Sequence, residues 1–582
     1  MVNSTRIFFR SVALIAACSM FGCVARSNGG LRQFPTVFPG SGSGAITPTA
    51  SLTQTMLQEQ VGPTPIVTAP PAIVLPDATG ASIACEANTL RVPLTIDPDG
   101  PPSVVSRIEA VGDVLYVLVN GGLYRTPAID IDAGAPAIVP VLLPGDQVAG
   151  RPVQELVDLV TDPSQIYVYA LDKAGHVFRW DIGLQAGALS YRAAPLDKYP
   201  DGLPYNFLAA APDQQRRLLI LDAAHGGLYT PNGIGDVVAV NQAQALTDSY
   251  DLTSAGNKVY FLTGTGAIRT TSGKTGSGDW RPSGATGLGL SLRTSDHLGV
   301  DLLVLVDGLR REITGLDPSS GLTLTRFVFN IKGLGLLRDA VFTNGRLYVV
   351  ADDSIYVYPG PATSEGSCDA PAAGTTPPRP MLYGVDVLSL ARGYFYPIVG
   401  GTLPQWPRVY PGAARIYRMG VHHGVDIYKV NGPKGFGEGY PAITIASGLV
   451  VKSTIVYGEM TDDDFQNLLH QSEALGQTPP EILDRLEGKQ VVIDHGNGLL
   501  SVYAHLQAVA PGIVPGAHVE AGQIIGGVGI TGTQAEGKPG TEAPHLHFEI
   551  WVGDRYLGFG ITERETMWWF HQIFDTSIAV GS

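Results

Sequence analysis

The chain has 582 residues, of which 16% are charged, and it contains 72 glycines and 43 prolines. A chain of this length accommodates three or four domains of about 100–200 residues each, and this composition is typical of short strands and many turns rather than long helices. The net charge is −15 and no cluster of lysine and arginine stands out, so nucleic acid and anionic membrane surfaces are poor candidate partners.

The first 22 residues have the pattern of an export signal. Arg6 and Arg10 form a positively charged start, and residues 11–22 form an apolar segment that is too short to span a bilayer comfortably. We therefore predict that residues 1–22 are a signal peptide and that the mature protein lies outside the cytoplasm.

Two cysteines near the end of this segment are candidate lipid sites. Cys23 follows Gly22, and a small residue before a cysteine at this point resembles a bacterial lipoprotein signal. We predict that Cys23 carries the lipid, because a cut at Cys18 would shorten the apolar segment to about seven residues. Cys18 remains an alternative, as does a plain secretory signal that is cut nearby. With a lipid on Cys23, the protein would be anchored on the outer side of the membrane, in the cell envelope.

Residues 23–80 are predicted to form a disordered tether. They are rich in proline, threonine, serine, glycine and glutamine, and such a composition cannot bury enough apolar surface to order itself. Once Cys18 is removed and Cys23 is lipidated, Cys85 and Cys368 are the two cysteines that remain. A pair of cysteines in an exported protein predicts a disulfide.

Residues 81–369 repeat one pattern six times. Each repeat has an apolar strand, a turn rich in Gly, Asp or Asn, and a second strand, which predicts a β-hairpin. The spacing of the repeats, about 41–52 residues, is in the range of propeller blades, so we predict an all-β chain that begins with a six-bladed β-propeller-like domain. A pair of β-sandwiches is the alternative, which the regular spacing disfavours. The central residues of the repeats are Tyr116, Tyr167, Leu219, Tyr260, Leu303 and Tyr348.

The predicted propeller shows no catalytic pattern. His176, His225 and His297 have no metal-ligand spacing, so we interpret the region as a binding or scaffolding module with a protein or glycan ligand. Cys85 and Cys368 lie just outside the first and last repeats, and a disulfide between them would close the propeller where its two ends meet.

Residues 370–390 are predicted to be a linker, and a region of different composition follows at residues 391–582. There the sequence HHGVD places His422 and Asp426 on one face of a strand, with His423 on the other. A fully extended strand would hold His422 and Asp426 about 13 Å apart, which is too far for one ion. We therefore expect a bend at Gly424.

The sequence PHLHFEI, residues 544–550, carries the second half of the pattern. His545, His547 and Glu549 alternate with apolar residues, so all three project from one face of a strand. Two histidines and a carboxylate with one position left for water are the usual ligand set of a catalytic zinc.

Four segments together resemble the lysostaphin-type zinc metallopeptidases, which cut peptide bonds in bacterial peptidoglycan. The resemblance covers residues 391 to about 560. The segments are HHGVD (422–426), VVIDHGNGLLSVYAHL (491–506), VPGAHVEAGQIIGGVGITG (514–532) and PHLHFEI (544–550). The resemblance implies an antiparallel β-sheet domain, zinc as the cofactor and peptidoglycan peptides as the substrate.

The same resemblance implies a role for five residues. The zinc ligands would be His422, Asp426 and His547, and the catalytic histidines would be His505 and His545. Zinc would activate water near neutral pH, and the two histidines would act as general base, general acid or oxyanion contact. Which histidine has which role is left open.

Glu549 has two interpretations from the sequence. It orients a zinc ligand without binding the ion itself, or it is a solvated carboxylate on the strand.

An insertion separates a strand that ends near Tyr457 from one at Gln490. Thr461 is a predicted N-cap, and Thr478 is predicted to cap a second helix with Pro479 at its first position. This helical hairpin would wall the substrate groove or dock against the propeller.

We consider three functions. The first is a zinc-dependent endopeptidase of the cell wall, tethered to the envelope. The second is a non-enzymatic envelope scaffold that activates other wall hydrolases, and the third is a peptidase that acts on Gly-rich secreted peptides. Degenerate relatives usually lack zinc ligands, so the presence of all three ligands favours the enzyme over the scaffold.

Overall fold

The computed structural model describes residues 73–75, 81–97, 100–132, 136–162, 164–191, 207–212, 217–223, 226–231, 237–242, 246–256, 258–271, 280–282, 289–297, 300–343, 345–358, 368 and 380–574. The predicted signal peptide, Cys23 and the predicted tether other than 73–75 lie outside the described residues. No helix among the described residues has the length and apolar character needed to cross a membrane.

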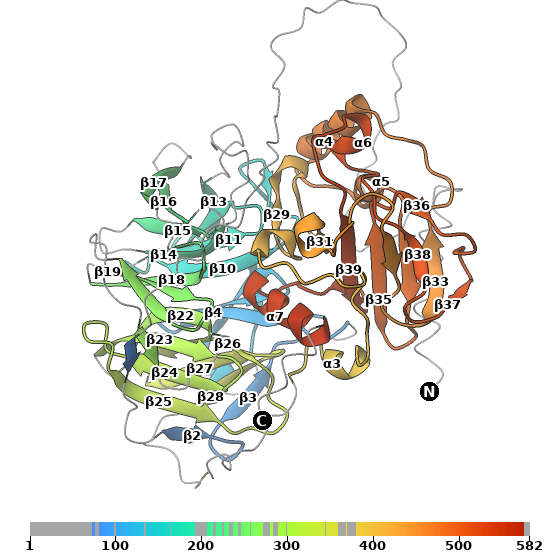
Figure 1. The fold of residues 1–582 in the computed structure, drawn as a ribbon. Helices are drawn as coiled ribbons and strands as arrows, with labels where there is room; N and C mark the ends of the chain where they lie inside the picture. Colours follow the sequence, from blue (N-terminus) through green and yellow to red (C-terminus); the bar gives the residue numbers. More distant parts are fainter. Residues whose placement is uncertain are drawn as a thin grey trace, which may run out of the picture. The chain divides into compact units, whose positions relative to one another are not determined.

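Residues 105–358 form six consecutive sheets, and each is built around one of the six predicted hairpins, which are therefore confirmed (Figure 1). The first three sheets hold β4 (Val105–Val111), β5 (Val114–Val119), β6 (Gly122–Pro127) and β7 (Val139–Leu142); β10 (Leu156–Thr161), β11 (Tyr167–Asp172), β12 (Val177–Asp181) and β13 (Ala186–Tyr191); and β14 (Phe207–Pro212), β15 (Leu218–Asp222), β16 (Gly227–Pro231) and β17 (Val237–Gln242). The last three hold β18 (Ser249–Ala255), β19 (Lys258–Thr263), β20 (Ile268–Thr271) and β21 (Trp280–Pro282); β22 (Gly289–His297), β23 (Val300–Asp307), β24 (Glu312–Leu316) and β25 (Thr323–Phe329); and β26 (Leu337–Thr343), β27 (Arg346–Ala351) and β28 (Ser354–Tyr358). A short helix, α2 (Ala128–Asp132), and a two-stranded ribbon of β8 (Gln147–Val148) and β9 (Arg151–Pro152) complete the region.

Three strands from the start of the region join sheets that come later in the chain. β1 (Ile73–Leu75) lies parallel to β21, β2 (Ser82–Ala84) lies parallel to β25, and β3 (Leu90–Pro93) pairs antiparallel with β28. A disulfide joins Cys85, which follows β2, to Cys368. The two ends of the repeat region are thus linked by both strand pairing and a covalent bond.

Buried charges connect the first strands of five of the sheets. Arg293 on β22 contacts Asp339 on β26 at 2.9 Å and Asp158 on β10 at 3.1 Å. Arg107 on β4 contacts the same Asp158 at 3.3 Å and Asp251 on β18 at 3.6 Å. Because a buried charge is tolerated only when it is paired and hydrogen-bonded, this network requires the five strands to keep their positions.

Burial suppresses the ionisation of two carboxyl groups of the network, Asp251 on β18 and Glu109 on β4. Burial raises the pKa of Glu109 to about 7; the charge of Arg293 opposes this shift and that of Asp339 adds to it. The folded protein therefore keeps this proton between about pH 4.5 and 7 whereas the unfolded chain loses it, so stability falls as the pH rises through this window and then levels off.

Glu109→Gln should remove that pH dependence, because glutamine cannot ionise. We expect the difference in stability between the variant and the wild type to shift in favour of the variant by at most about 3 kcal/mol as the pH rises from 5 to 8. This figure is an upper limit, because 17% of the Glu109 side chain remains exposed to solvent. Thermal unfolding of both proteins at the two pH values measures this. The same difference in melting temperature at both pH values would contradict the prediction.

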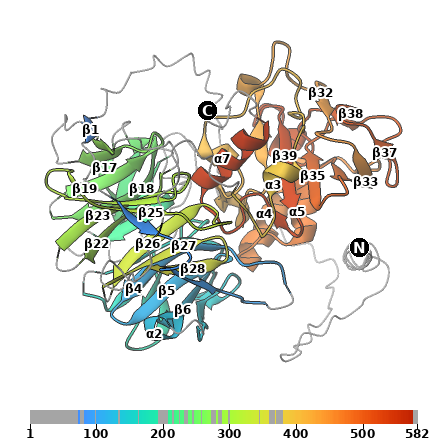
Figure 2. The ribbon, with the colours of Figure 1, turned by 90° about the horizontal axis from the view of Figure 1, so that it is seen from below.

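The C-terminal region is built on a twisted antiparallel sheet with the strand order β31-β39-β35-β34-β33-β37, and β40 pairs with β39 (Figures 1 and 2). A second, three-stranded sheet has the order β32-β38-β36 and a two-stranded ribbon joins β29 to β30. The strands are β29 (Ala414–Arg415), β30 (Gly420–Val421), β31 (Val425–Ile427), β32 (Pro441–Ile443), β33 (Gly448–Ser453), β34 (Val491–Asp494), β35 (Leu499–Ala504), β36 (Ala508–Val509), β37 (His518–Val519), β38 (Ile524–Gly527), β39 (Leu546–Val552) and β40 (Arg555–Tyr556). The helices are α3 (Val387–Leu390), α4 (Asp462–Leu475), α5 (Pro480–Glu487), α6 (Gln534–Gly537) and α7 (Glu563–Phe574), with 3-10 turns at Pro407–Val409, Ile416–Arg418 and Lys429–Asn431.

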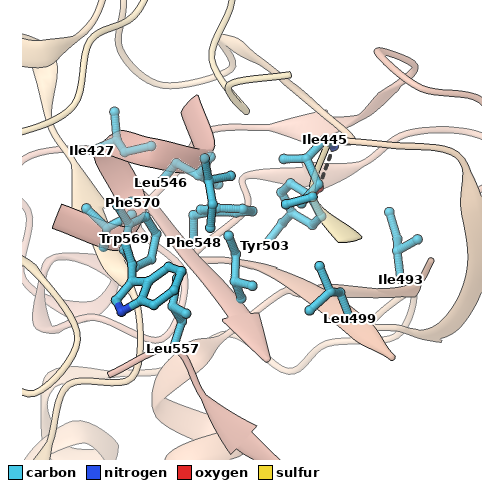
Figure 3. Close-up of a cluster of buried hydrophobic side chains, with 14 of the residues drawn as sticks. Ile427, Ile445, Ile493, Leu499, Tyr503, Leu546, Phe548, Leu557, Trp569 and Phe570 are labelled. Carbon is cyan, nitrogen blue, oxygen red and sulfur yellow. Dashed lines mark hydrogen bonds between the residues drawn. The ribbon is translucent and has the colours of Figure 1, made fainter. Parts of the chain in front are cut away.

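One face of the large sheet forms the core of this region (Figure 3). The other face carries the polar residues of β39, since side chains alternate along a strand. Leu546 and Phe548 point into the core beside Tyr503 of β35, whose hydroxyl accepts a hydrogen bond from the Ile445 N–H at 2.8 Å. Trp569 of α7 packs against the same cluster (Figure 3). The alternation predicted for PHLHFEI is therefore present, and it leaves His547 and Glu549 on the opposite face.

The predicted helical hairpin is confirmed, with one correction. Thr461 caps α4, and its hydroxyl and the carboxylate of Asp464 form a reciprocal capping box. The prediction for the second helix was wrong by one residue, because α5 begins at Pro480 and its N-cap is Pro479. The Thr478 hydroxyl does not cap α5, since it donates to the carbonyl of Arg418.

Candidate metal centre and catalytic site

Strand pairing brings the two histidine motifs together. Asp426 on β31 lies opposite His547 on β39, and the chain leaves the strand geometry at residues 422–424, where the sequence predicted a bend. A Cβ atom at Gly424 would lie 2.7 Å from His547 Nε2. Glycine is therefore required there for β31 to approach β39 closely enough.

Three ligand atoms converge in the resulting space. His422 Nε2 lies 2.9 Å from Asp426 Oδ1 and 3.0 Å from His547 Nδ1, and His547 Nδ1 lies 3.0 Å from Asp426 Oδ1. All three side chains are buried. These separations are slightly shorter than the roughly 3.3 Å between ligand atoms around a tetrahedral ion with bonds of about 2.0–2.1 Å.

The outer nitrogens of both histidines are held by acceptors. His422 donates from Nδ1 to the Tyr410 carbonyl at 3.2 Å, and His547 donates from Nε2 to Glu549 Oε1 at 2.8 Å. These hydrogen bonds leave His422 Nε2 and His547 Nδ1 as the nitrogens that face the centre, which is the usual arrangement of metal-binding histidines. The interpretation of Glu549 as a solvated carboxylate was wrong, since this residue is buried.

Asp426 is held in the same way. Its Oδ2 accepts a hydrogen bond from Arg415 Nη2 at 3.0 Å, which leaves Oδ1 toward the two histidines. Three electron-pair donors thus meet at one point, with two nitrogens and one oxygen among them. This donor set and its fixed orientation fit a zinc ion.

The electrostatics of the three residues show what a cation would replace. Burial lowers the pKa of His422 to about 3. Burial by itself would also lower the pKa of His547, but its hydrogen bonds to Asp426 and Glu549 raise it to about 10. A proton on His547 Nδ1 therefore balances the charge of Asp426, and a divalent cation that binds between these atoms would displace it.

Two further histidine rings, His505 and His545, lie beside the centre. His505 is held through Nδ1 by the Thr531 carbonyl at 2.9 Å, and His545 is held through Nδ1 by the Ala543 carbonyl at 3.0 Å. Their ring centroids are 4.8 Å apart, and His545 Nε2 lies 3.8 Å from Asp426 Oδ1. The structure thus gathers all five predicted site residues, four histidines and one aspartate, in one place.

His505 has two properties expected of a functional group. Burial lowers its pKa well below the usual value, and the charges of His545 and His547 add to the effect. Its backbone φ is 57°, a conformation that non-glycine residues rarely adopt and that is common at active sites. His505 is therefore neutral at pH 7 and can accept a proton at Nε2.

Sequence reasoning missed several residues that hold these side chains in place. The Tyr428 ring stacks on His545 with centroids 4.4 Å apart, and its hydroxyl donates to Glu542 at 3.1 Å. Tyr428 lies two residues after Asp426, so strand alternation could have placed it on the same face. No signal in the sequence would have identified Arg415 or the carbonyl of Tyr410.

His423 does not join the cluster, as its position in the motif predicted. Its ring stacks on Tyr556 with centroids 4.7 Å apart. The Tyr556 hydroxyl donates to Glu155 at 2.6 Å, and Lys173 Nζ donates to the same hydroxyl at 2.8 Å. Residues of the repeat region therefore contact the ring that supports His423.

Residues 480–558 match the model of Peptidase family M23. The matched part includes His505, His545 and His547, and the motif with His422 and Asp426 precedes it. The C-terminal part of the chain therefore carries a peptidase domain of family M23, and the resemblance drawn from the motifs is confirmed.

A curated relative matches part of the same domain. The L-Ala--D-Glu endopeptidase of Bacillus subtilis (strain 168) is 38% identical over 68 residues, which are 12% of this chain and 21% of the relative. This chain thus spans about a fifth of the length of that relative.

Two solved structures each align with a part of the chain. The catalytic domain of the prophage-encoded M23 protein EnpA from Enterococcus faecalis is 20% identical and covers 23% of this chain and 74% of its own, with a TM-score of 0.15. Virginiamycin B lyase from Staphylococcus aureus is 12% identical and covers 45% of this chain and 81% of its own, with a TM-score of 0.31.

Proposed function

From the M23 peptidase domain at its C-terminus, we propose that this chain is a zinc-dependent endopeptidase that hydrolyses peptide bonds in bacterial cell-wall peptidoglycan. The observation that carries the proposal is the convergence of His422, Asp426 and His547 beside the rings of His505 and His545. The name of the Bacillus subtilis relative supports a peptide of the cell wall as the substrate.

In this proposal each side chain has a defined task. His422, Asp426 and His547 hold the zinc ion, which supplies Lewis-acid chemistry by activating a water molecule near neutral pH and polarising the peptide carbonyl. His505 and His545 present Nε2 within the same space, where one accepts a proton from the nucleophile and the other donates to the developing oxyanion or to the leaving amine.

We further propose the arrangement of the whole chain. Residues 1–22 are the signal peptide, and 23–80 form the tether that links a lipid on Cys23 to the folded body. Residues 81–369 form a closed six-bladed propeller that binds a protein or glycan and positions the enzyme, 370–390 are a linker, and 391–582 are the peptidase domain. The pairing of β3 with β28 and the disulfide between Cys85 and Cys368 support the closure. The protein then acts outside the cytoplasm, at the cell envelope.

The direct test uses purified, zinc-loaded protein that lacks its first 23 residues. Incubation with isolated peptidoglycan should release new peptide amines, which mass spectrometry detects and assigns to a bond. A sample treated with EDTA should release none. No release by zinc-loaded protein would overturn the endopeptidase and favour a scaffold that activates other hydrolases, and release from Gly-rich peptides but not from peptidoglycan would change the substrate.

His505→Ala should keep its zinc but lose about 10²- to 10⁴-fold in kcat, the usual contribution of a general acid or base. Metal content and single-bond cleavage are measured on the same sample. His518→Ala is the matched control, because His518 lies exposed on β37, and this variant should retain the wild-type rate. Wild-type turnover by His505→Ala would remove this residue from the catalytic group.

A further inference from the structure

One peptide group, the one between Thr531 and Gly532, lies between His505 and a carboxylate. The Thr531 carbonyl accepts the hydrogen bond from His505 Nδ1 at 2.9 Å, and the Gly532 N–H donates to Glu536 Oε2 at 2.8 Å. The carbonyl and the N–H of a trans peptide group point in opposite directions. His505 and Glu536 are therefore joined through the two sides of a single peptide group.

The hydrogen bond from His505 determines which of its ring nitrogens carries the proton. A carbonyl oxygen can only accept a hydrogen bond, so the contact between Nδ1 and the Thr531 carbonyl requires the proton on Nδ1. The neutral ring then has its lone pair on Nε2, which is the nitrogen that accepts a proton in the proposed reaction. If the Thr531 carbonyl turned away, this tautomer would lose its support.

The end of α5 packs directly against the same peptide group. A Cβ atom at Gly532 would collide with the Leu486 carbonyl, and a Cβ atom at Gly488 would collide with the Thr531 carbonyl. Both Thr531 and Gly532 are buried. Because a buried N–H without an acceptor is unfavourable, the Gly532 N–H depends on the acceptor that Glu536 provides.

Glu536 is itself held by a residue at the start of the helical insertion. The Tyr457 hydroxyl donates to the same Oε2 at 2.7 Å, and the Arg485 guanidinium of α5 lies over the Tyr457 ring, 4.7 Å from its centroid. Burial and the hydrogen bond to Glu536 raise the pKa of Tyr457, so this hydroxyl keeps its proton and remains a donor at pH 7. The carboxylate therefore receives one hydrogen bond from Tyr457 and one from Gly532.

The position of Glu536 is also fixed by the contact between α6 and α4. The side chain of Gln534, in the same short helix as Glu536, donates to Asp462 Oδ1 at the start of α4 at 3.0 Å. A Cβ atom at Gly537 would collide with the backbone of Thr461 and Asp462, so the two helices are in backbone contact. The insertion thus holds α6 in the place where its carboxylate meets Gly532.

We propose that Glu536 is a positioning residue for His505. Its carboxylate fixes the Thr531–Gly532 peptide group, and the carbonyl of that group holds the His505 ring with the proton on Nδ1 and the lone pair on Nε2. Hydrogen bonds on the two sides of one peptide group strengthen each other, so the carboxylate also makes the Thr531 carbonyl a better acceptor. The inference rests on the proposed function, in which His505 transfers a proton during peptide hydrolysis.

The test compares variants that keep or remove the acceptor for the Gly532 N–H. Glu536→Ala removes it, whereas Glu536→Gln keeps an amide oxygen in its place. Glu481→Gln is the matched control, because Glu481 lies exposed on α5. Tyr457→Phe is a milder variant, which removes one of the two hydrogen bonds to the carboxylate and keeps the aromatic ring.

Three quantities are measured on the same purified, zinc-loaded proteins. They are the zinc content, kcat and KM for soluble peptide fragments of peptidoglycan, and the proton resonance of His505 Nδ1–H. Proteins labelled with ¹⁵N-histidine show this resonance by nuclear magnetic resonance, and its absence in His505→Ala assigns it. The resonance reports the hydrogen bond to Thr531 whether or not the protein cleaves a peptide.

We expect Glu536→Ala to lose about 10- to 100-fold in kcat, the usual effect of removing a partner that orients a functional histidine, with KM and zinc content unchanged. Its Nδ1–H resonance should move upfield, because the hydrogen bond to Thr531 becomes weaker. Tyr457→Phe should show a smaller change in the same direction. Glu536→Gln should keep most of the rate, and Glu481→Gln should match the wild type in every measurement.

An unchanged Nδ1–H resonance or an unchanged kcat in Glu536→Ala would overturn the proposal, and so would a fall in kcat that only follows a loss of zinc. If Glu536→Ala does not fold, an unchanged resonance in Tyr457→Phe would overturn it in the same way. A shifted resonance in Glu536→Ala together with no cleavage by the wild type would support the positioning of His505 and overturn the endopeptidase. Zinc-dependent cleavage with an unshifted resonance would support the endopeptidase and overturn the role of Glu536.

Discussion

His547→Ala is expected to abolish both zinc binding and hydrolysis. His547 supplies one of the three converging ligand atoms, and its Nδ1 lies within 3.0 Å of both partners. Its loss leaves two protein ligands, His422 and Asp426, and deprives Glu549 of the hydrogen bond that neutralises it. Zinc content by mass spectrometry and cleavage of isolated peptidoglycan should both fall to background.

The matched control for this variant is His470→Ala, since His470 lies exposed on α4. It should keep one zinc per chain and the wild-type rate. Full metal content in His547→Ala would show that the ion is held elsewhere, and the ligand assignment would then be wrong.

Glu565→Leu is expected to destabilise the protein by about 3–5 kcal/mol, the usual effect of removing one partner from a buried ion pair. Glu565 on α7 forms two hydrogen bonds of 3.0 Å with Arg338 on β26. Side-chain exposure is 3% for Arg338 and 1% for Glu565, so the variant would leave an unpaired charge between the last sheet of the repeat region and the C-terminal helix. Thermal or denaturant unfolding measures the loss.

Two companion variants separate the ion pair from general damage to α7. Arg338→Met combined with Glu565→Leu removes both charges and should recover most of the stability, because neither partner of the ion pair is left as an unpaired charge. Lys452→Met breaks the ion pair with Asp484, whose side chains are 44% and 54% exposed, and should cost at most about 1 kcal/mol. A Glu565→Leu loss as small as that of Lys452→Met would contradict the prediction.

Local sequence patterns predicted the elements whose geometry depends on near neighbours. The alternation in residues 544–550 predicted which side chains of β39 face the core, because strand side chains alternate regardless of what packs against them. The six hairpins followed from strand and turn residues in the same way. The start of α5 did not, because Thr478 is engaged by Arg418, 60 residues earlier in the chain.

The supporting contacts of the site could not be predicted, because they join residues with no local relation. Arg415 reaches Asp426 from β29, and Tyr410 contributes a backbone carbonyl, which carries no residue-specific signal. The buried charges of the repeat region have the same character. Arg107, Asp158 and Asp339 would be expected on a surface, and burial is tolerated only because partners from other sheets compensate each charge.

The sequence by itself determined the chemistry of this protein: the residue types and their spacing in two short motifs, a family-level resemblance, and the repeat of six hairpins. These features depend on neighbours within a few residues, and the alternation of side chains along a strand produces a pattern that can be recognised in the sequence. Only the tertiary structure decided which nitrogen of each ligand histidine faces the centre, how Arg338 joins α7 to the last sheet, and that one peptide group joins Glu536 to His505. Each of these depends on burial and on partners that are distant in the chain, and both arise only when the sheets pack.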